Sequence, residues 1–260
     1  MQPLIDADVL VYECGFASEA GWGKDKGAPP FDYCAEFLDN RIAAICAAVE
    51  ATQPPILYLT GKTNFRNKIA KRQAYKDRPG NKPYHYKNLI AYIKGKYDYR
   101  LTEGLEADDL ICIEQTSRPE ETIICTRDKD LRACGGWHYG WELGNQPSFG
   151  PERVEGVGRI TLSRDRKSIK GVGLLFFYSQ CLTGDRVDSI PGLDGCGAVG
   201  AWETLKDCKT AQEALQAVYK AYKAKYGMNA YAEMLEQGRL LWMTRKLRDD
   251  GTPILWGQTR

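Results

Sequence analysis

Apolar residues along this chain follow two spacings, which predict alternating strands and helices. Short runs that are apolar throughout are typical of strands buried on both faces of a parallel sheet. Such runs occur at residues 3–6, 55–60 and 122–126. Apolar positions three and four apart predict helices with one buried face, and this spacing extends from about Asp32 to Val49 and over 88–93. Residues 15–30, which are rich in Gly, Ala and Pro, predict a loop.

The second half of the chain continues with strands and then with helices. The predicted elements are a strand at 97–101, an edge strand at 158–163, helices at 172–182 and 198–205, two helices within 210–242 and a final strand at 253–256. This order predicts an α/β fold, with a central, mostly parallel sheet flanked by helices and a helical C-terminal region. A chain of 260 residues can form one large domain or two small ones.

Acidic residues follow the predicted buried strands. Asp6 ends the first strand, and Asp128 and Asp130 follow the strand at 122–126. A third group, Glu106, Asp108 and Asp109, begins a predicted helix. In open α/β sheets, ligands collect outside the carboxyl ends of the strands, so these carboxylates predict a metal site. The competing interpretation is that acidic residues in a first helical turn act as helix caps.

A basic block stands apart from these acids. The net charge is only +2, but residues 62–100 contain twelve Lys or Arg against two Asp. Cations interleaved with aromatic rings suit a single strand of nucleic acid, with rings for the bases and cations for the phosphates. The alternative is a solvated helix face. The candidate DNA-binding residues of this block are Lys62, Lys71, Arg72, Tyr75 and Arg78.

A glycine-rich segment at 184–197 joins the two helices predicted at 172–182 and 198–205. Gly192, Gly195 and Gly197 would leave backbone N–H groups accessible at a helix start, which suits a phosphate. Asp185 and Asp188 lie about one turn apart in the same segment. The alternative is an ordinary helix C-cap followed by a turn.

The sequence gives little support for a P-loop, a zinc site or a membrane span. Gly61-Lys62-Thr63 lacks the glycine that a P-loop requires at position 56, which is Ile. Nine cysteines without a Cys-x-x-Cys pair, and two histidines, give a zinc site few ligands. No apolar run approaches 18 residues, so we expect no membrane span and a cytoplasmic protein.

The motifs together resemble those of the flap endonuclease and 5′-to-3′ exonuclease family, especially its small stand-alone phage enzymes. The resemblance covers about two thirds of the chain, over residues 4–131 and 172–206. The matching blocks are Leu4 to Tyr12, Phe65-Arg66 with Tyr75-Lys76, Glu106 to Asp109, Asp128 to Leu131, and Gly184-Asp185 through Asp188 and Ile190-Pro191-Gly192 to Gly197.

This resemblance implies a PIN-like nuclease core at 1–170, with a helical arch at about 62–94, and a helix-hairpin-helix-type duplex-binding region at 171–260. Two magnesium ions, for which manganese substitutes, would be held by carboxylates that match Asp6, Glu106, Asp108, Asp109, Asp128, Asp130, Asp185 and Asp188. Lys76 and Arg66 would lie near the scissile phosphate, and Tyr12 would stack on the terminal base. A potassium ion would sit at the turn near 190–197.

The implied activity is magnesium-dependent cleavage of DNA with a free or flapped 5′ end, and of RNA:DNA hybrids, by a monomer in the host cytoplasm. One departure stands out, because the family carries an Asp after the second strand and residues 59–64 here contain no carboxylate. One ligand is therefore missing or replaced by water, or Asp8, two residues beyond Asp6, partly compensates for it. A PIN-type endoribonuclease and a non-catalytic DNA-binding protein are the alternatives.

Overall fold

The computed structural model describes residues 1–23, 26–76 and 80–258. The chain forms two compact units. Unit 1 comprises Met1–Thr63, Pro79–Asp128 and Gly136–Arg153, and unit 2 comprises Asn64–Arg78, Lys129–Gly135 and Val154–Arg260. This division differs from the expected domain boundary at 170/171, because the segment before residue 170 packs within unit 2. The expected arch segment at 62–94 is shared between the units.

Unit 1 is built on a six-stranded sheet, counted over the described residues, in the order β3-β2-β1-β4-β5-β6. Its strands are β1 (Gln2–Asp6), β2 (Ile56–Leu59), β3 (Tyr99–Leu101), β4 (Thr122–Cys125), β5 (Gly136–Gly140) and β6 (Phe149–Val154). Strand β1 pairs in parallel with β2 on one side and β4 on the other, and β2–β3 and β4–β5 are also parallel. The predicted α/β class with a mostly parallel sheet is confirmed.

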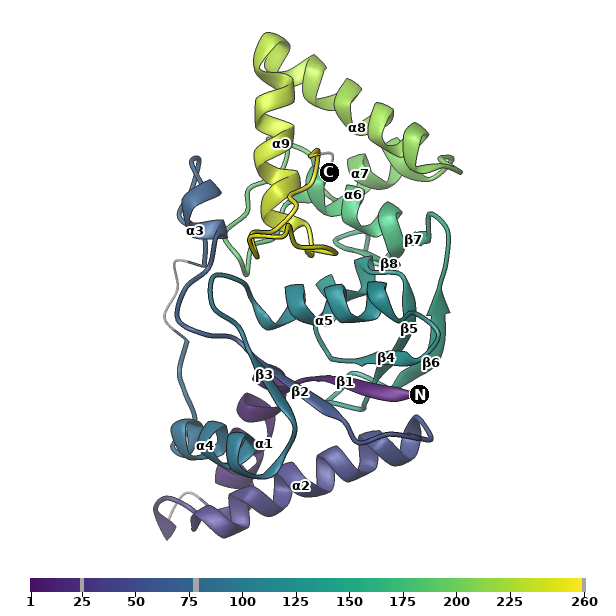
Figure 1. Cartoon of the computed structure of the whole chain (residues 1–260). Helices are drawn as coiled ribbons and strands as arrows, with labels where there is room; N and C mark the ends of the chain where they lie inside the picture. The colour runs from purple at the N-terminus through teal and green to yellow at the C-terminus, as the bar shows by residue number, and fades with distance from the viewer. Residues whose placement is uncertain (24–25, 77–79, 259–260) are drawn as a thin grey trace. The chain divides into compact units, whose positions relative to one another are not determined.

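Helices cover both faces of this sheet (Figure 1). Helices α1 (Ala7–Trp22), α2 (Phe31–Ala48) and α4 (Tyr86–Lys96) lie on one face, and α5 (Ala107–Ser117) lies on the other. The loop predicted at 15–30 is therefore wrong for its first part, where α1 continues to Trp22. Small buried residues of α1, including Cys14 and Ser18, allow close packing. Small residues are also common in loops, so this composition led to the wrong prediction.

Unit 2 is mainly helical. Its elements are α3 (Arg66–Ile69), the 3-10 turn η2 (Asp130–Ala133), the antiparallel hairpin of β7 (Arg159–Leu162) and β8 (Ile169–Val172), α6 (Gly173–Thr183), α7 (Ala198–Leu205), α8 (Ala211–Tyr226), η3 (Gly227–Asn229) and α9 (Ala230–Leu241).

Helix α6 is central to unit 2, because it contacts α7, α8, α9 and both strands of the hairpin. The final strand predicted at 253–256 is wrong, since only Pro253 makes an isolated bridge, to Leu247. Trp256 instead packs its ring against Phe177 of α6. Within the described ranges, none of the helices is both long and apolar enough to cross a membrane.

Truncation of a core side chain tests this description of unit 1. Leu57 of β2 is completely buried, so Leu57→Ala should lower the free energy of unfolding by about 2–5 kcal/mol, through lost burial and the cavity left behind. Leu101 of β3 is 42 % exposed, and Leu101→Ala should cost less than about 0.5 kcal/mol. Urea denaturation of both variants measures the difference, and equal losses would contradict the assignment of the core.

Candidate metal and nucleic-acid site

Asp6 lies where β1 passes into α1, and its buried carboxylate is held on both oxygens. One oxygen caps α1 by accepting a hydrogen bond from the Val9 N–H at 3.2 Å. The other accepts from the Thr126 hydroxyl at 2.7 Å. Parallel neighbours end at the same edge of a sheet, which is why the residue after β4 reaches the end of β1.

Thr126 also connects Asp6 to the Asp128 loop. Its hydroxyl oxygen accepts a hydrogen bond from the Asp128 N–H at 2.9 Å while the hydroxyl proton goes to Asp6. The structure thereby brings together two of the predicted ligands, Asp6 and Asp128, through a buried threonine. Sequence reasoning missed Thr126, although its position directly after an apolar strand and before Asp128 was available as a signal.

The departure after the second strand has a structural explanation. The Thr60 N–H donates to both carboxylate oxygens of Asp8, at 3.1 and 3.3 Å, so an acid from α1 lies at the end of β2. At Gly61, an added Cβ would lie 1.8 Å from the Thr102 carbonyl oxygen. No side chain fits at Gly61 in this backbone. Asp8 brings a carboxylate to this strand end, and the Glu103 carboxyl carbon lies 3.4 Å from the position of the added Cβ.

The group at the start of α5 forms a reciprocal cap. Glu106 is the N-cap, and its backbone N–H donates to the Asp109 carboxylate at 3.1 Å. Asp109 is completely buried and Asp108 is half-buried. The Thr60 hydroxyl accepts from the Ala107 N–H at 2.9 Å, which ties this helix start to the end of β2. The helix-cap interpretation is confirmed for Glu106 and Asp109, and the metal-site interpretation of this group stays a prediction.

In unit 2, Asp130 and Asp185 form a second buried acidic pair. Burial raises the pKa of Asp130, and the negative charge of Asp185 raises it further. The Lys129 ammonium contacts Asp185 and lies 3.5 Å from Asp130, while the Gln180 amide donates to Asp130. Lys129 and Gln180 were not predicted. Lys129 was the easier to find, since it stands between Asp128 and Asp130.

Asp188 is bound by the neighbouring end of the basic block. The Tyr75 hydroxyl donates to one carboxylate oxygen at 3.0 Å, and the Lys76 ammonium lies 3.7 Å from the other. The Lys76 N–H also donates to the Asp188 carbonyl at 3.1 Å. The predicted catalytic lysine therefore lies against a predicted metal ligand, while Tyr75 is 8 % exposed and packs into the core of unit 2.

Two other cations of the basic block bind protein carbonyls. Arg66 is completely buried and donates to the carbonyls of Leu240 at 2.9 Å and Trp242 at 2.8 Å. Arg72 donates to the Gly192 carbonyl at 3.0 Å and to the Asp194 carboxylate at 2.7 Å. In this structure both guanidinium groups hold segments of unit 2 together.

The predicted glycine-rich turn connects α6 and α7. Asp185 and Ile190 exchange backbone hydrogen bonds across it, at 2.8 and 2.7 Å. Gly184 and Gly192 both have positive φ and pack together, and a Cβ on Gly192 would lie 2.3 Å from the Gly184 nitrogen. Gly192 therefore closes the turn. Gly195 and Gly197 have open space around them, so a ligand can approach their backbone closely.

The remaining predicted DNA contacts lie at the surface or outside the described residues. Tyr12 is half-buried in an aromatic group, 5.3 Å from the ring of Tyr86, and shares a face of α1 with Asp8 one turn earlier. Lys62 and Lys71 are exposed. Arg78 lies outside the described residues.

Oxygen ligands in buried pairs fit magnesium, which keeps several waters and uses one or two carboxylates. Burial and the charge of Asp8 raise the pKa of Asp6 to about 6, because both disfavour its charged form. Among residues 1–23, 26–76 and 80–258, no group of three or more His, Cys, Asp or Glu side chains is gathered closely enough to hold an ion. The acids of these residues instead form pairs, Asp6 with Asp8 in unit 1 and Asp130 with Asp185 in unit 2.

Solved structures share this fold. A bacteriophage T5 flap endonuclease in complex with DNA and metal ions is 13 % identical, with a TM-score of 0.53 over 92 % of this chain and 98 % of that one. A T5 5′-exonuclease with bound zinc is 15 % identical, with a TM-score of 0.53 over 92 % and 95 % of the two chains. A T5 protein co-crystallised with metal ions is 13 % identical, with a TM-score of 0.54 over 91 % and 88 %.

No protein-family model and no curated protein matches the sequence. The structural likeness confirms the resemblance in fold to the flap endonuclease and 5′-to-3′ exonuclease family.

The raised pKa of Asp6 predicts a pH dependence of stability without divalent ions. The folded state binds a proton on Asp6 up to about pH 6, whereas the unfolded state releases it near the ordinary aspartate pKa of 3.8. Folding is therefore linked to proton uptake in this window, and the contribution of Asp6 to stability should fall as pH rises from about 4 to 6. Urea denaturation in EDTA should show this slope for wild type and a flatter one for Asp6→Asn. Identical slopes would contradict the assignment.

Arg66 provides a test between a structural and a catalytic role. Removal of the guanidinium takes away the hydrogen bonds to the buried Leu240 and Trp242 carbonyls, so Arg66→Ala should lower the free energy of unfolding by more than about 2 kcal/mol. Lys68→Ala removes an exposed cation from the same helix and should cost less than about 0.5 kcal/mol. If Arg66→Ala were as stable as wild type but lost nuclease activity, the catalytic role implied by the resemblance would be supported instead.

Proposed function

We propose that this chain is a divalent-metal-dependent 5′-to-3′ exonuclease and flap endonuclease that hydrolyses DNA phosphodiester bonds. The observation that carries the proposal is the end of the parallel sheet, where Thr126 joins the carboxylate of Asp6 to the loop of Asp128. The fold likeness to T5 enzymes supports it, since those structures contain DNA and metal ions.

The proposed metal is magnesium, two ions of it, with manganese as a substitute. In unit 1, the residues that would hold metal are Asp6, Asp8, Glu106, Asp108, Asp109 and Asp128. In unit 2, the candidate ligands are Asp130, Asp185 and Asp188. When bound, such ions supply an activated water and stabilise charge on the leaving 3′ oxygen.

The protein's own residues would position the substrate and its charge. Thr126 fixes the orientation of Asp6, so that the carboxylate does not have to reorganise when a cation binds. The Lys76 ammonium would stabilise charge on the phosphoryl oxygens. The half-buried ring of Tyr12 would stack on the terminal base, one helical turn from Asp8.

The proposed substrate is DNA with a free or flapped 5′ end, together with RNA:DNA hybrids. Exposed cations such as Lys62 and Lys71 within 62–94 would attract the single strand, as the arch implied by the resemblance does. The open backbone at Gly195 and Gly197 would bind phosphates of the duplex, and a potassium ion would bind in the same turn. A monomer acting in phage replication or DNA degradation, in the host cytoplasm, fits this role.

A non-catalytic DNA-binding protein is the second candidate, and one observation favours it. The Thr102 carbonyl leaves no space for a side chain at Gly61, so the acid expected after β2 is replaced by Asp8 from α1. If Asp8 does not serve as a ligand, metal binding in unit 1 would be weakened and DNA would be bound without cleavage.

The experiment that separates the two candidates is cleavage of flap duplexes labelled at the 5′ or the 3′ end, with magnesium or with EDTA. Short products from the 5′ end should appear with wild type and magnesium only. Asp128→Asn should lower the rate by at least about 100-fold while DNA binding persists, because it removes a ligand and leaves the cations intact. Asp207→Asn, at an exposed acid, is the matched control and should cleave like wild type.

Binding of DNA by wild type without cleavage under any divalent ion would overturn the nuclease proposal and favour the binding-protein alternative. Cleavage by Asp128→Asn at the wild-type rate would overturn the assignment of Asp128 as a metal ligand and leave the nuclease proposal standing.

A further inference from the structure

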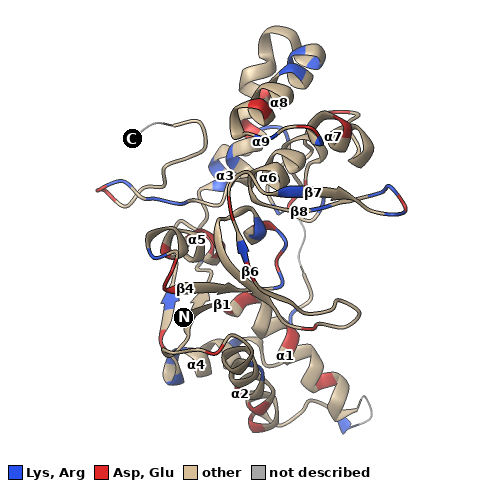
Figure 2. Cartoon of the chain, turned by 90° about the vertical axis from the view of Figure 1, so that its right-hand side faces the viewer, with Lys and Arg blue, Asp and Glu red and all other residues tan. Residues whose placement is uncertain are grey.

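The β7–β8 hairpin carries positive charge that the proposed function does not use. Figure 2 shows Lys and Arg positions along this hairpin. Its exposed cations include Arg164, Arg166, Lys167 and Lys170, and Asp165 is the only acid of residues 159–172. Over the described residues, none of these four cations has a carboxylate partner. Four neighbouring unpaired cations repel one another, so an anion bound there would relieve that repulsion.

Asp165, the acid of the hairpin, uses its carboxylate for hydrogen bonds within the turn. The Asp165 carboxylate accepts hydrogen bonds from the Ser163 hydroxyl at 2.6 Å and the Lys167 N–H at 3.1 Å. These hydrogen bonds lower the pKa of Asp165, so it stays ionised and keeps the turn in shape. Asp165 therefore serves as a structural acceptor while the cations around it face solvent.

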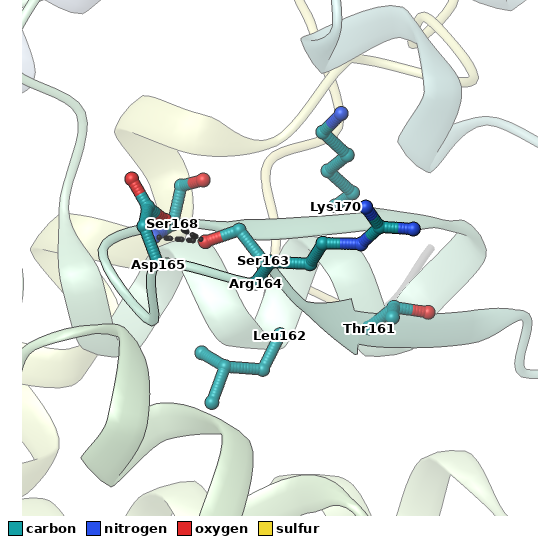
Figure 3. Close-up of a pocket in the computed structure, with 7 residues that line it drawn as sticks. All are labelled: Thr161, Leu162, Ser163, Arg164, Asp165, Ser168 and Lys170. Carbon is teal, nitrogen blue, oxygen red and sulfur yellow. Dashed lines mark hydrogen bonds between the residues drawn. The ribbon is translucent and has the colours of Figure 1, made fainter.

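Hydrogen bonds and packing hold the hairpin in place. Ser163 and Ser168 close the turn through two hydrogen bonds, at 2.9 and 3.0 Å, and Figure 3 shows the side-chain bonds of Ser163. Ile160 and Ile169 pack against the apolar core of unit 2. Because strand side chains alternate between faces, Thr161 and Lys170, which are directly opposite each other, project away from that core.

Two hollows border the hairpin, both within unit 2. One, of about 580 Å³, is lined by Arg164 and Lys170 (Figure 3). The other, of about 730 Å³, has Arg166, Lys167 and Ser168 on one wall. Its other residues include Gly184, Arg186, Gly197 and the first residues of α7. The hairpin turn and the glycine-rich turn are thus two walls of one hollow.

We propose that the β7–β8 hairpin is a second phosphate-binding wall, which holds the sugar–phosphate backbone of duplex DNA together with the glycine-rich turn at 184–197. The proposal rests on the proposed function, because it names duplex DNA as the ligand. Arg166 and Lys167 bind phosphates within the shared hollow, and Arg164 and Lys170 extend the same charged surface along the hairpin. Such contacts are independent of base sequence, as binding to a duplex of any sequence requires.

The test is the salt dependence of binding to a fluorescent, blunt 30-base-pair duplex, measured by anisotropy in EDTA so that cleavage plays no part. Arg166→Ala/Lys167→Ala should weaken binding about 10-fold at low salt, and should reduce the slope of log affinity against log salt by about 2, close to one unit per lost phosphate contact. Lys220→Ala/Lys223→Ala removes the same charge from exposed positions of α8 and should leave the slope within experimental error.

Thermal unfolding should show equal stability for both double variants, since all four side chains are exposed. An unchanged slope in the hairpin variant, or the same reduction in the α8 variant, overturns the second-wall proposal and leaves the nuclease proposal standing. Failure of wild type to bind the duplex at all overturns both. Arg166→Lys/Lys167→Arg, which keeps the charges, should retain the wild-type slope.

Discussion

Repulsion between buried carboxylates is the constraint on which the candidate site depends. Asp6 lies against Asp8 in unit 1, and Asp130 lies against Asp185 in unit 2. Donors surround each pair and reduce the repulsion within it: the Thr126 hydroxyl and the Thr60 N–H in unit 1, and the Gln180 amide and the Lys129 ammonium in unit 2. These donors hold the carboxylates in fixed orientations, and the pKa values of Asp6 and Asp130 remain raised despite them.

Most of the fold could be predicted because each buried strand leaves an apolar run, and each helix on the sheet leaves a three-to-four spacing. The exceptions have physical reasons. The second half of α1 is built from small residues that resemble a loop in composition, and Trp256 is apolar because it packs on Phe177 rather than in a strand. The division into units depends on tertiary contacts, so it could not be read from local spacing.

Sequence reasoning anticipated that Asp6 and Asp128 would lie close together, and it missed the side chains that bind them; their role as metal ligands stays a prediction. Asp6 and Asp128 follow strands, so their common location follows from parallel pairing. The sequence around Thr126 and Thr60 does not show their role, because their hydrogen bonds form only when the strands pair in the fold. In the basic block, composition predicted a positively charged surface but could not show which cations reach it. Lys71 is exposed, whereas Arg66 is buried and its guanidinium donates hydrogen bonds to two backbone carbonyls.

The close approach at Gly61 also restricts how this sequence can evolve. With the Thr102 carbonyl 1.8 Å from the place of a Cβ, one nucleotide change that gives Asp at this codon would have to move a neighbouring strand end as well. An acid introduced at Gly61 would therefore require a shift of the backbone around Thr102, whereas Asp8 brings its carboxylate to the Thr60 N–H without any such shift.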